Sequence, residues 1–215
     1  MKDVSPPVFD ADFQDRLKEL MAWRRDVRRF RTDPVPGELI ARLLEVAALA
    51  PSVGNSQPWR FVLVEDAARR AKVVANFERA NKEALSDYSG EQAKLYASLK
   101  LAGLKEAPVH LAIFCDEATS QGHGLGRRTM PEMLDYSAVM AVYGFWLAAR
   151  AAGLGAGWVS IFEPEALTRD LDVEPDWKLV AYLCVGWPEE VQARPELERA
   201  GWEHRRGVDE QIIKR

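Results

Sequence analysis

The sequence is poor in the residues that form disulfides and metal sites. Its 215 residues include 2 cysteines and 3 histidines. Cys115 and Cys184 each lie inside an apolar run, which favours buried free thiols over a disulfide and agrees with a reducing cytoplasm. The histidines are far apart and form no short ligand spacing with a cysteine or a carboxylate. We therefore expect no metal site.

Long hydrophobic runs and a surplus of positive charge are also missing. No apolar stretch approaches the roughly 18 residues that span a bilayer, and the first residues, MKDVSPPVFDADFQD, are too acidic for a secretory signal. The net charge of −4 gives no sign of a nucleic-acid-binding protein. The composition, 47% hydrophobic and 29% charged, is typical of a globular protein with one core. No repeat or linker interrupts it, so residues 1–215 are predicted to form a single domain.

Hydrophobic periodicity predicts helices and strands in alternation. The predicted helices cover residues 12–23, 36–50, 67–83, 91–105 and 133–152, and the predicted strands cover 59–65, 110–116, 157–162 and 179–187. Helices of this length between strands indicate an α+β or α/β layered fold.

Two segments suggest contacts beyond a single chain. The helix predicted over 133–152 is apolar nearly all round, which is typical of a helix buried on several sides. In a protein of this size, one way to bury it is against another subunit. The tail after Trp187 is charged, with a small apolar group at Val208, Ile212 and Ile213 that could pack against a partner.

The densest charge cluster follows the first predicted helix, in the segment WRRDVRRFR from Trp23 to Arg31. Arginines complement the negative end of a helix, so we expect the helix to end here and the chain to continue extended. Such arginines can converge on a phosphate, where each charge-assisted bond contributes about 1.5–3 kcal/mol. A solvated basic helix end with an internal Asp–Arg pair is an equally good explanation of this motif alone.

A second unusual stretch is APSVGNSQPWR, from Ala50 to Arg60, between a predicted helix and a predicted strand. Its hydroxyls, carboxamides and backbone N–H groups can contact a polar heterocycle, and its small residues allow a flat ring to approach closely. We interpret it as a binding loop rather than a plain connection.

The glycine-rich run AGLGAGWVSIF, residues 152–162, imitates a dinucleotide fingerprint but has the wrong spacing and follows a helix instead of a strand. The run GHGLG, residues 122–126, fails in the same way, and the chain has no recognisable nicotinamide or nucleoside-triphosphate site. Ser160 is a lone hydroxyl in an otherwise apolar predicted strand, where a buried hydroxyl needs a partner from the backbone or a ligand. Without a G-x-S-x-G elbow, Ser160 is interpreted as a hydrogen-bonding group and not a nucleophile.

Taken together, these stretches resemble the nitroreductase-like flavoprotein superfamily. The likeness rests on RRxVR at 24–28, PSxxNxQPW at 51–59 and the glycine-rich entry to a late strand. Within the superfamily, the likeness is greatest to a flavin-destroying branch. It rests there on the aspartate inside RRDVR and on the segments GRRTMPEM, WLAAR, GWVSI, AYLCVG and PELE. It covers nearly the whole chain from about Trp23 onward.

The resemblance implies an α+β sandwich in which helices flank a central, mostly antiparallel sheet. It also implies an intertwined homodimer with FMN at the interface, a flexible N-terminus over about 1–10 and a C-terminal extension over about 188–215 that packs on the partner. The implied reaction takes reduced FMN as substrate, supplied by a separate flavin reductase, and O2 as co-substrate. Its expected products are 5,6-dimethylbenzimidazole, the lower ligand of cobalamin, and a four-carbon sugar phosphate.

The resemblance assigns the catalytic roles to Asp26, as a proton shuttle, and to Ser160. The FMN-binding residues that it implies are Arg24, Arg25, Asp26, Val27, Arg28, Ser52, Asn55, Ser56, Gln57, Leu104, Gly157, Ser160 and Arg205, with Arg206 as a further candidate for the phosphate. Burial would raise the pKa of Asp26, flanking arginines would lower it, and a proton shuttle needs the effect of burial. We therefore expect the Asp26 carboxylate to turn toward the flavin ring and the arginines toward the phosphate.

Two other functions stay open at this point. One is a conventional NAD(P)H-dependent nitroreductase or flavin reductase that retains FMN as a cofactor. The other is a non-catalytic flavin-binding protein, in which Asp26 and Ser160 are replaceable without consequence. The three functions differ in whether NADH is consumed by the protein alone and whether flavin is lost in air.

Overall fold

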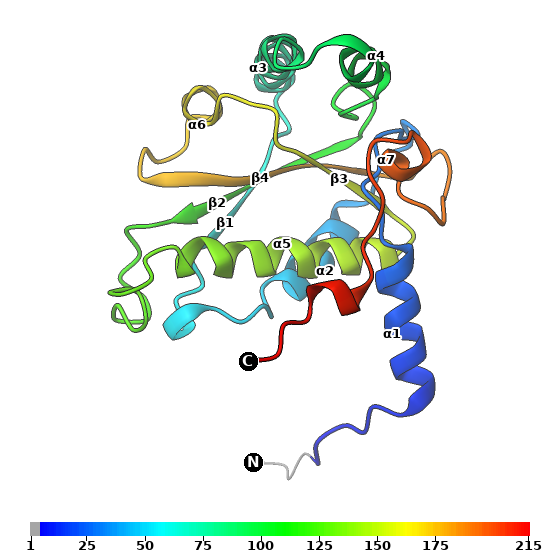
Figure 1. The fold of residues 1–215 in the computed structure, drawn as a ribbon. Helices are drawn as coiled ribbons and strands as arrows, with labels where there is room; N and C mark the ends of the chain where they lie inside the picture. The colour runs from blue at the N-terminus through cyan, green and yellow to red at the C-terminus, as the bar shows by residue number, and fades with distance from the viewer. Residues whose placement is uncertain (1–4) are drawn as a thin grey trace.

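A four-stranded sheet lies between two layers of helices in the computed structural model, which describes residues 5–215 (Figure 1). The strands are β1 (Trp59–Leu63), β2 (Val109–Asp116), β3 (Gly155–Val159) and β4 (Trp177–Gly186). Their order is β1-β2-β4-β3, and each neighbouring pair is antiparallel. The predicted α+β sandwich with an antiparallel sheet is confirmed.

The helices are distributed over both faces of this sheet. One face carries α2 (Gly37–Ala47) and α5 (Met133–Ala151), and the other carries α3 (Ala67–Leu85), α4 (Gly90–Ser98) and α6 (Pro164–Leu171) (Figure 1). Helix α1 (Ala11–Trp23) extends away from the body beside the end of α5. The short elements are η1 (Val53–Asn55), α7 (Glu196–Arg199) and η2 (Val208–Gln211).

Strand β2 shows how the apolar pattern builds two cores. Successive side chains of a strand point to opposite faces of the sheet. Leu111 and Ile113 accordingly pack in the core shared with α2 and α5, whereas Ala112 and Phe114 pack in the core shared with α3 and α6. All four are fully buried. Burial on both faces explains why this strand reads as one continuous apolar run.

Two predicted elements have wrong boundaries, and one helix was missed. The helix predicted to reach residue 105 ends at Ser98, and an irregular segment follows, where a Cβ at Gly103 would lie 2.4 Å from the Phe30 ring. The strand predicted over 157–162 is β3, which begins at Gly155 and ends at Val159. Helix α6, which begins with Pro164 in its first turn, was not predicted at all because its eight residues follow directly on an apolar segment.

The N-terminal residues and the two cysteines were both subjects of sequence-based predictions. Of the predicted flexible N-terminus, residues 1–4 lie outside the described part, and residues 5–10 are exposed without regular structure. Cys115 and Cys184 are buried and unpaired, which confirms the expected free thiols. No helix within residues 5–215 is both long enough and apolar enough to cross a membrane.

Helix α3 has a side-chain cap that α4 lacks. The Asp66 carboxylate accepts a hydrogen bond from the backbone N–H of Arg69 at 2.8 Å, whereas Ser89, at the start of α4, makes no such bond. Since removal of an N-cap side chain costs about 1 kcal/mol, we expect Asp66→Ala to lower the free energy of unfolding by about that amount. Ser89→Ala is the matched control, for which urea denaturation is expected to show a change of only a few tenths. Equal losses in both variants would contradict this account of the cap.

Candidate functional site

The segment after α1 lies against the edge of β3. Helix α1 ends at Trp23, and Arg24 has extended backbone (φ −67°, ψ 123°), as the cluster of arginines predicted. The backbone N–H of Val27 donates to the carbonyl of Ala156 at 3.1 Å, and Asp26 forms a parallel bridge with Ala156. The RRDVR segment is therefore fixed beside the glycine-rich strand.

Two glycines allow this close approach. A Cβ at Gly155 would lie 2.6 Å from Cγ2 of Val27, and one at Gly157 would lie 2.1 Å from the Val27 carbonyl oxygen. Both distances are too short for any side chain. The glycine-rich run therefore allows close contact with residues 26 and 27. This contact explains why glycines are needed here, although they form no dinucleotide fingerprint.

A cavity of about 380 Å³ opens at this contact. It lies between the RRDVR segment, the last turns of α5 and the chain that follows β4. Its lining includes six arginines and three carboxylates: Arg25, Arg28, Arg29, Arg150, Arg194 and Arg199, with Asp26, Glu190 and Glu196. The excess of positive charge suits an anionic ligand.

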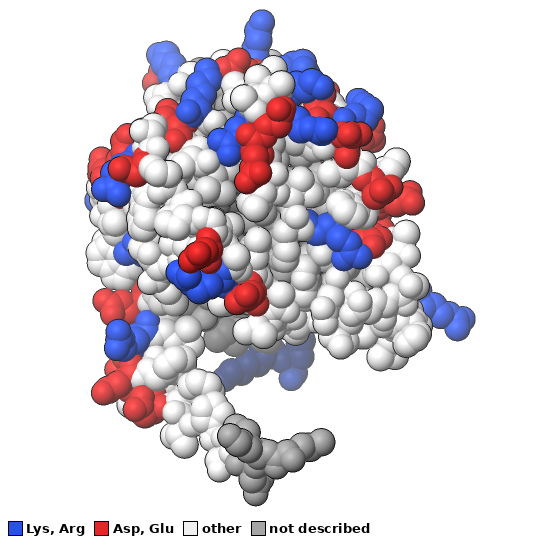
Figure 2. Space-filling model, turned by 180° about the vertical axis from the view of Figure 1, so that it is seen from behind, with Lys and Arg blue, Asp and Glu red and all other residues white. Residues whose placement is uncertain are grey.

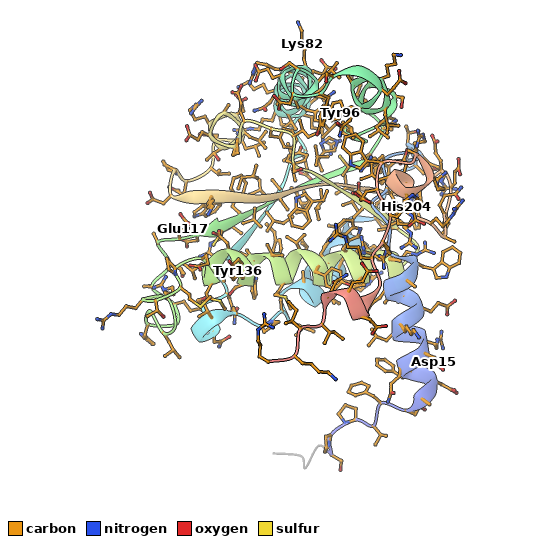
Figure 3. The ribbon with its side chains drawn as sticks, viewed as in Figure 1. Asp15, Lys82, Tyr96, Glu117, Tyr136 and His204 are labelled. Carbon is orange, nitrogen blue, oxygen red and sulfur yellow. The ribbon has the colours of Figure 1, made fainter. Side chains whose placement is uncertain are left out.

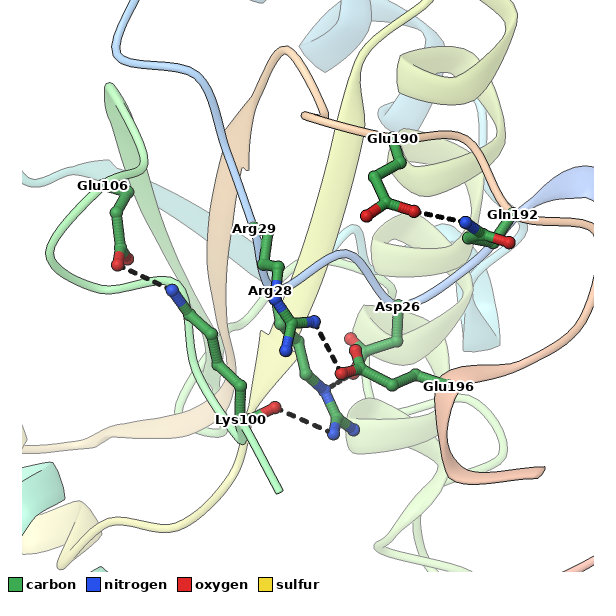
Figure 4. A network of polar contacts seen from close by, with 8 residues as sticks. All are labelled: Asp26, Arg28, Arg29, Lys100, Glu106, Glu190, Gln192 and Glu196. Carbon is green, nitrogen blue, oxygen red and sulfur yellow. Dashed lines mark hydrogen bonds and ion pairs between the residues drawn. The ribbon is translucent and has the colours of Figure 1, made fainter. Parts of the chain in front are cut away.

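Asp26 is held at this cavity through both carboxylate oxygens. Its Oδ1 accepts from the backbone N–H of Trp158 at 2.8 Å, and its Oδ2 accepts from Nε of Arg28 at 2.8 Å (Figure 4). Burial raises the pKa of Asp26 above its ordinary value, and the charge of Arg28 and the bond from Trp158 oppose that rise without cancelling it. About 31% of the side chain remains exposed. The group therefore has the perturbed pKa and the access that a proton carrier needs.

The arginines of this segment have different partners. The guanidinium of Arg24 stacks over Trp146, 4.5 Å from the ring centroid. Arg25 donates to two backbone carbonyls, those of Arg24 and Ala193, and Arg29 pairs with Glu196 at 2.7 Å. The buried Nε atoms of Arg24 and Arg25 have no hydrogen-bond partner among the described residues.

The Asp26–Arg28 contact differs from the expectation that the arginines turn away from Asp26. In extended backbone, residues two apart lie on the same side, which brings these two side chains together. The internal Asp–Arg pair considered as an alternative for this motif does form. The segment is nevertheless no solvated helix end, because only 10% of the Arg28 side chain is exposed and the backbone joins β3.

Arg205 lies in the exposed tail after α7. Burial lowers the pKa of Arg25 below its ordinary value, and the positive charges of Arg205 and Arg24 lower it further. An effect of this kind requires the two guanidinium groups to be near each other. Arg205 is therefore brought toward the same cluster of arginines from a position 180 residues later in the chain.

Ser160 is not the buried strand residue that was expected. β3 ends one residue earlier, at Val159, its last partner on β4 being Tyr182. Ser160 follows as an exposed residue, and its carbonyl accepts from the N–H of Phe162 at 3.1 Å in a tight turn toward α6. It lies two residues beyond Trp158, about 7 Å along the chain, with its hydroxyl open to a ligand.

The predicted loop residues lie elsewhere. Ser52 Oγ accepts from the N–H of Gln57 at 3.1 Å, and Nε2 of Gln57 donates to the side chain of Asn55 at 3.1 Å. Ser56 is buried, with a hydroxyl that has no partner among the described residues. The N–H of Val53 bonds to Oγ of Ser137 in the first turns of α5, which anchors the whole loop there.

The loop and the RRDVR segment occupy opposite ends of α5. The loop is anchored at Ser137, whereas the indole of Trp146 donates to the carbonyl of Arg25 at 3.2 Å. Nine residues of helix separate these two anchors, about 14 Å along its axis. Figure 1 shows η1 and α1 at the two ends of the helix. One chain therefore does not bring all the predicted FMN-binding residues together.

Leu104 is in the core, not at the cavity surface. It is 6% exposed and packs in the same core as Phe30. Nearby, the carbonyl of Lys100 accepts from Arg28, so this segment reaches the site through its backbone.

Sequence reasoning missed the part of the lining that follows β4, including Glu190, Gln192 and Arg194. These residues are in a tail whose composition is simply charged, without a motif. The segments WLAAR and PELE contributed only to the resemblance, although they supply Arg150 and Glu196 to the cavity. No group of three potential metal-ligating side chains occurs within residues 5–215.

Sequence comparison identifies relatives over most of the chain. A protein named 5,6-dimethylbenzimidazole synthase from Rhodospirillum rubrum is 58% identical over 200 residues, which are 93% of this chain and 95% of that protein. A protein of the same name from Rhodobacter capsulatus is 50% identical over 91% of this chain and 94% of its own length. A Thermus thermophilus protein named NADH dehydrogenase is 31% identical over 87% of this chain and 91% of its own length.

Solved structures agree with this placement. Oxidised iodotyrosine deiodinase bound to FMN and 3-iodo-L-tyrosine superposes with a TM-score of 0.70 and 27% identity, over 82% of this chain and 91% of that one. A nitroreductase family protein from Streptococcus pneumoniae, 21% identical with a TM-score of 0.66 over 92% of this chain and 99% of its own, shares the fold. The model of the nitroreductase family matches residues 21–187. The chain therefore belongs to the nitroreductase family, alongside the 5,6-dimethylbenzimidazole synthases that it matches over most of its length.

Proposed function

We propose that this protein converts reduced FMN and O2 into 5,6-dimethylbenzimidazole and a four-carbon sugar phosphate. The observation that carries the proposal is the position of Asp26, a carboxylate with a raised pKa at the edge of an arginine-rich cavity. The relatives at 58% and 50% identity bear the name of this activity.

The cavity fits a phosphate-bearing flavin. Arg25 lines the cavity, and Arg24 stacks on Trp146, another lining residue. The buried Nε atoms of both arginines have no partner among the described residues, and Arg205 approaches Arg25 from the tail. Charge-assisted bonds of this kind hold phosphate strongly. When bound, reduced FMN supplies both the electrons that O2 accepts and the ring carbons of the product.

Asp26 and Ser160 have separate roles in this proposal. The two hydrogen bonds to Asp26 fix its carboxylate, and the rise of its pKa caused by burial makes it a better proton acceptor than an ordinary aspartate. Ser160, at the end of β3, donates a hydrogen bond to the reacting region of the substrate. In this proposal the bound flavin and a second copy of the chain close the cavity against water, which protects a reactive intermediate.

A complete site requires a second copy of the chain. The loop from Ser52 to Gln57 is about 14 Å of helix from the RRDVR segment in one chain. In a two-fold dimer packed along α5, the loop of one chain can lie near Asp26 of the other. We therefore place FMN between two chains, each giving one half of its contacts.

The uncovered surface of the chain suits such a dimer. Helix α1 has no buried residue, and its Phe13 and Met21 are 45% and 40% exposed. On α5, Tyr136 and Met140 are 50% and 47% exposed. Figure 3 labels Tyr136 on this helix. In the view from behind, charged side chains are densest at the α3–α4 end, and a broad uncharged area lies below it (Figure 2). Exposed apolar side chains on two neighbouring helices are typical of a surface covered by a partner.

In this proposal the C-terminal extension makes contacts within its own chain and with the partner chain. Its first part stays on its own chain, where Pro188 bridges to Phe30 and Glu196 pairs with Arg29. Its last part leaves Val208 and Ile213 67% and 71% exposed. We propose that only this last part, from about Val208 onward, packs on the partner.

The dimer is tested with Met140→Arg. A charge in the centre of the apolar face of α5 is expected to raise the dissociation constant of the dimer at least tenfold, because burying it without a partner costs several kcal/mol. Sedimentation velocity measures this, with Ala75→Arg on exposed α3 as a control that keeps the wild-type dimer. A wild-type chain that sediments as a monomer at micromolar concentration would overturn the proposal.

The reaction is tested by incubating the protein with FMN, NADH and an added flavin reductase in air. Mass spectrometry is expected to find 5,6-dimethylbenzimidazole, and flavin absorbance is expected to fall only with both the reductase and oxygen present. NADH consumption by the protein alone would instead indicate a nitroreductase or flavin reductase. Flavin binding with no new aromatic product would indicate a binding protein.

A further inference from the structure

Arg28 is the one arginine of the segment whose guanidinium is committed to Asp26. Its neighbours contact a tryptophan ring, backbone carbonyls or a glutamate of the tail. Arg28 is also well enclosed, since 10% of its side chain is exposed compared with 44% for Arg29. Arg28 therefore differs from Arg24, Arg25 and Arg29, because none of their guanidinium groups bonds to the Asp26 carboxylate.

Arg28 is held from a second side by the segment after α4. Its Nη1 donates to the carbonyl of Lys100 at 3.1 Å, while its Nε donates to Asp26. The side chain of Lys100 is itself paired with Glu106 at 2.6 Å. Figure 4 shows this chain of contacts from Glu106 to Asp26. With both ends of its guanidinium engaged, Arg28 has little freedom to swing toward a phosphate.

Asp26 in turn depends on this arrangement for its direction. Trp158 fixes one carboxylate oxygen through its backbone N–H, a bond that does not depend on its side chain. Arg28 bonds to the other oxygen, Oδ2, and this second bond stops the carboxylate from rotating about its bond to Trp158. A carboxylate held by one bond alone would rotate, and small errors in the placement of a catalytic group greatly lower the reaction rate.

We propose that Arg28 is a positioning residue, which orients the Asp26 carboxylate at the cavity and is itself held by the backbone of Lys100. The effect of Arg28 on catalysis rests on the proposed function, but the pairing of Arg28 with Asp26 can be tested without it. It separates Arg28 from Arg24 and Arg25, to which phosphate binding is left.

The charge of Arg28 gives the proposal a measurable signature. An opposite charge within a few ångströms favours the ionised form of a carboxyl group, typically by about one to three pKa units. Arg28 opposes the rise that burial causes in the pKa of Asp26. Its removal is therefore expected to raise this pKa further, by about one unit or more.

The experiment compares Arg28→Gln with Arg28→Lys. NMR titration of aspartate carboxyl carbons in the full-length protein, with Asp26→Asn to assign the resonance, follows the pKa of Asp26 directly. We expect Arg28→Gln to raise it by about one unit, and Arg28→Lys to restore most of the difference because it keeps the charge. Arg31→Gln is the matched control, since Arg31 also pairs with an aspartate, Asp33, at 3.2 Å but does not line the cavity.

Binding and turnover give the second readout. For Arg28→Gln we expect the limb of the pH–rate profile that depends on Asp26 to move to higher pH and kcat to fall, while the Kd for FMN stays within roughly threefold. A tenfold rise of Kd with an unmoved Asp26 pKa would make Arg28 a phosphate ligand and overturn the proposal. If the wild type forms no benzimidazole, the proposed function fails, but the carboxyl titration still decides the role of Arg28.

Discussion

Asp26→Asn is expected to lower the rate of benzimidazole formation at least about 100-fold, the lower range for general acid–base groups. The asparagine keeps the shape of the side chain, and its carbonyl oxygen can still accept from the N–H of Trp158. It cannot take up and release a proton. Because Arg24 and Arg25 are not bonded to Asp26, the Kd for FMN is expected to change by less than roughly threefold.

The measurement follows product by mass spectrometry and FMN binding by quenching of flavin fluorescence. Asp33→Asn is the matched control, since Asp33 also pairs with an arginine but is 60% exposed, and it should change neither quantity. Loss of FMN binding in Asp26→Asn, in place of loss of turnover, would show that Asp26 only organises the arginines. Full activity of the variant would remove the proposed proton carrier.

The second large effect is a loss of stability in mild acid that depends on His110. This residue is 1% exposed, and its Nδ1 lies 2.8 Å from the hydroxyl of Tyr182. Burial, together with the charge of Arg70, lowers the pKa of His110 from 6.5 to about 4. Because the folded-state pKa is lower than the unfolded value, the neutral ring contributes its full stability above about pH 6.5. That contribution is lost as the pH falls toward 4, and amounts to about 3 kcal/mol in total.

Denaturation with urea at pH 7 and pH 5 isolates this effect. For the part that depends on His110, linkage gives a loss of about 2 kcal/mol between these two values. His110→Asn, which can still pair with Tyr182, is expected to show a pH dependence that is smaller by this amount, even if its stability at pH 7 is lower. His123→Asn, at an exposed histidine, should lose the same free energy of unfolding between pH 7 and pH 5 as the wild type. Parallel curves for wild type and His110→Asn would contradict the shifted pKa.

Much of the fold was predictable because its signals are local. The end of α1 at Trp23 follows from a run of arginines at a helix C-terminus. The apolar run of β2 indicates a strand buried on both faces. Such patterns depend on residues that are close in sequence, so they can be recognised from the sequence alone.

The wrong boundaries depend on distant contacts. Helix α4 stops at Ser98 because the following segment turns to pack Gly103 on the ring of Phe30, more than 70 residues earlier. β3 ends at Val159 because its pairing with β4 ends there, not because its apolar pattern does. Ser160 accordingly appeared buried in the sequence and is exposed in the structure.

The site was predictable in part for the same reason. Its RRDVR segment is a continuous motif, so its extended course could be anticipated, whereas its place beside the glycine-rich strand is seen only in the structure. The pairing within it could not, because Arg28 turns to Asp26 through contacts that involve Lys100 and Trp158. The cavity wall after β4 carries no motif, and only the three-dimensional structure brings Arg194 to it.

The bridge between Asp26 and Ala156 also has a consequence for the solubility of the folded chain. β3 is the outermost strand on its side of the sheet, and an open outermost strand offers backbone groups to strands of other molecules. The segment carrying Asp26 and Val27 occupies this position through the bond from Val27 to Ala156. The segment proposed to bind the substrate thus also covers the edge of the sheet. Substitutions that displace it are therefore expected to cause aggregation as well as loss of activity.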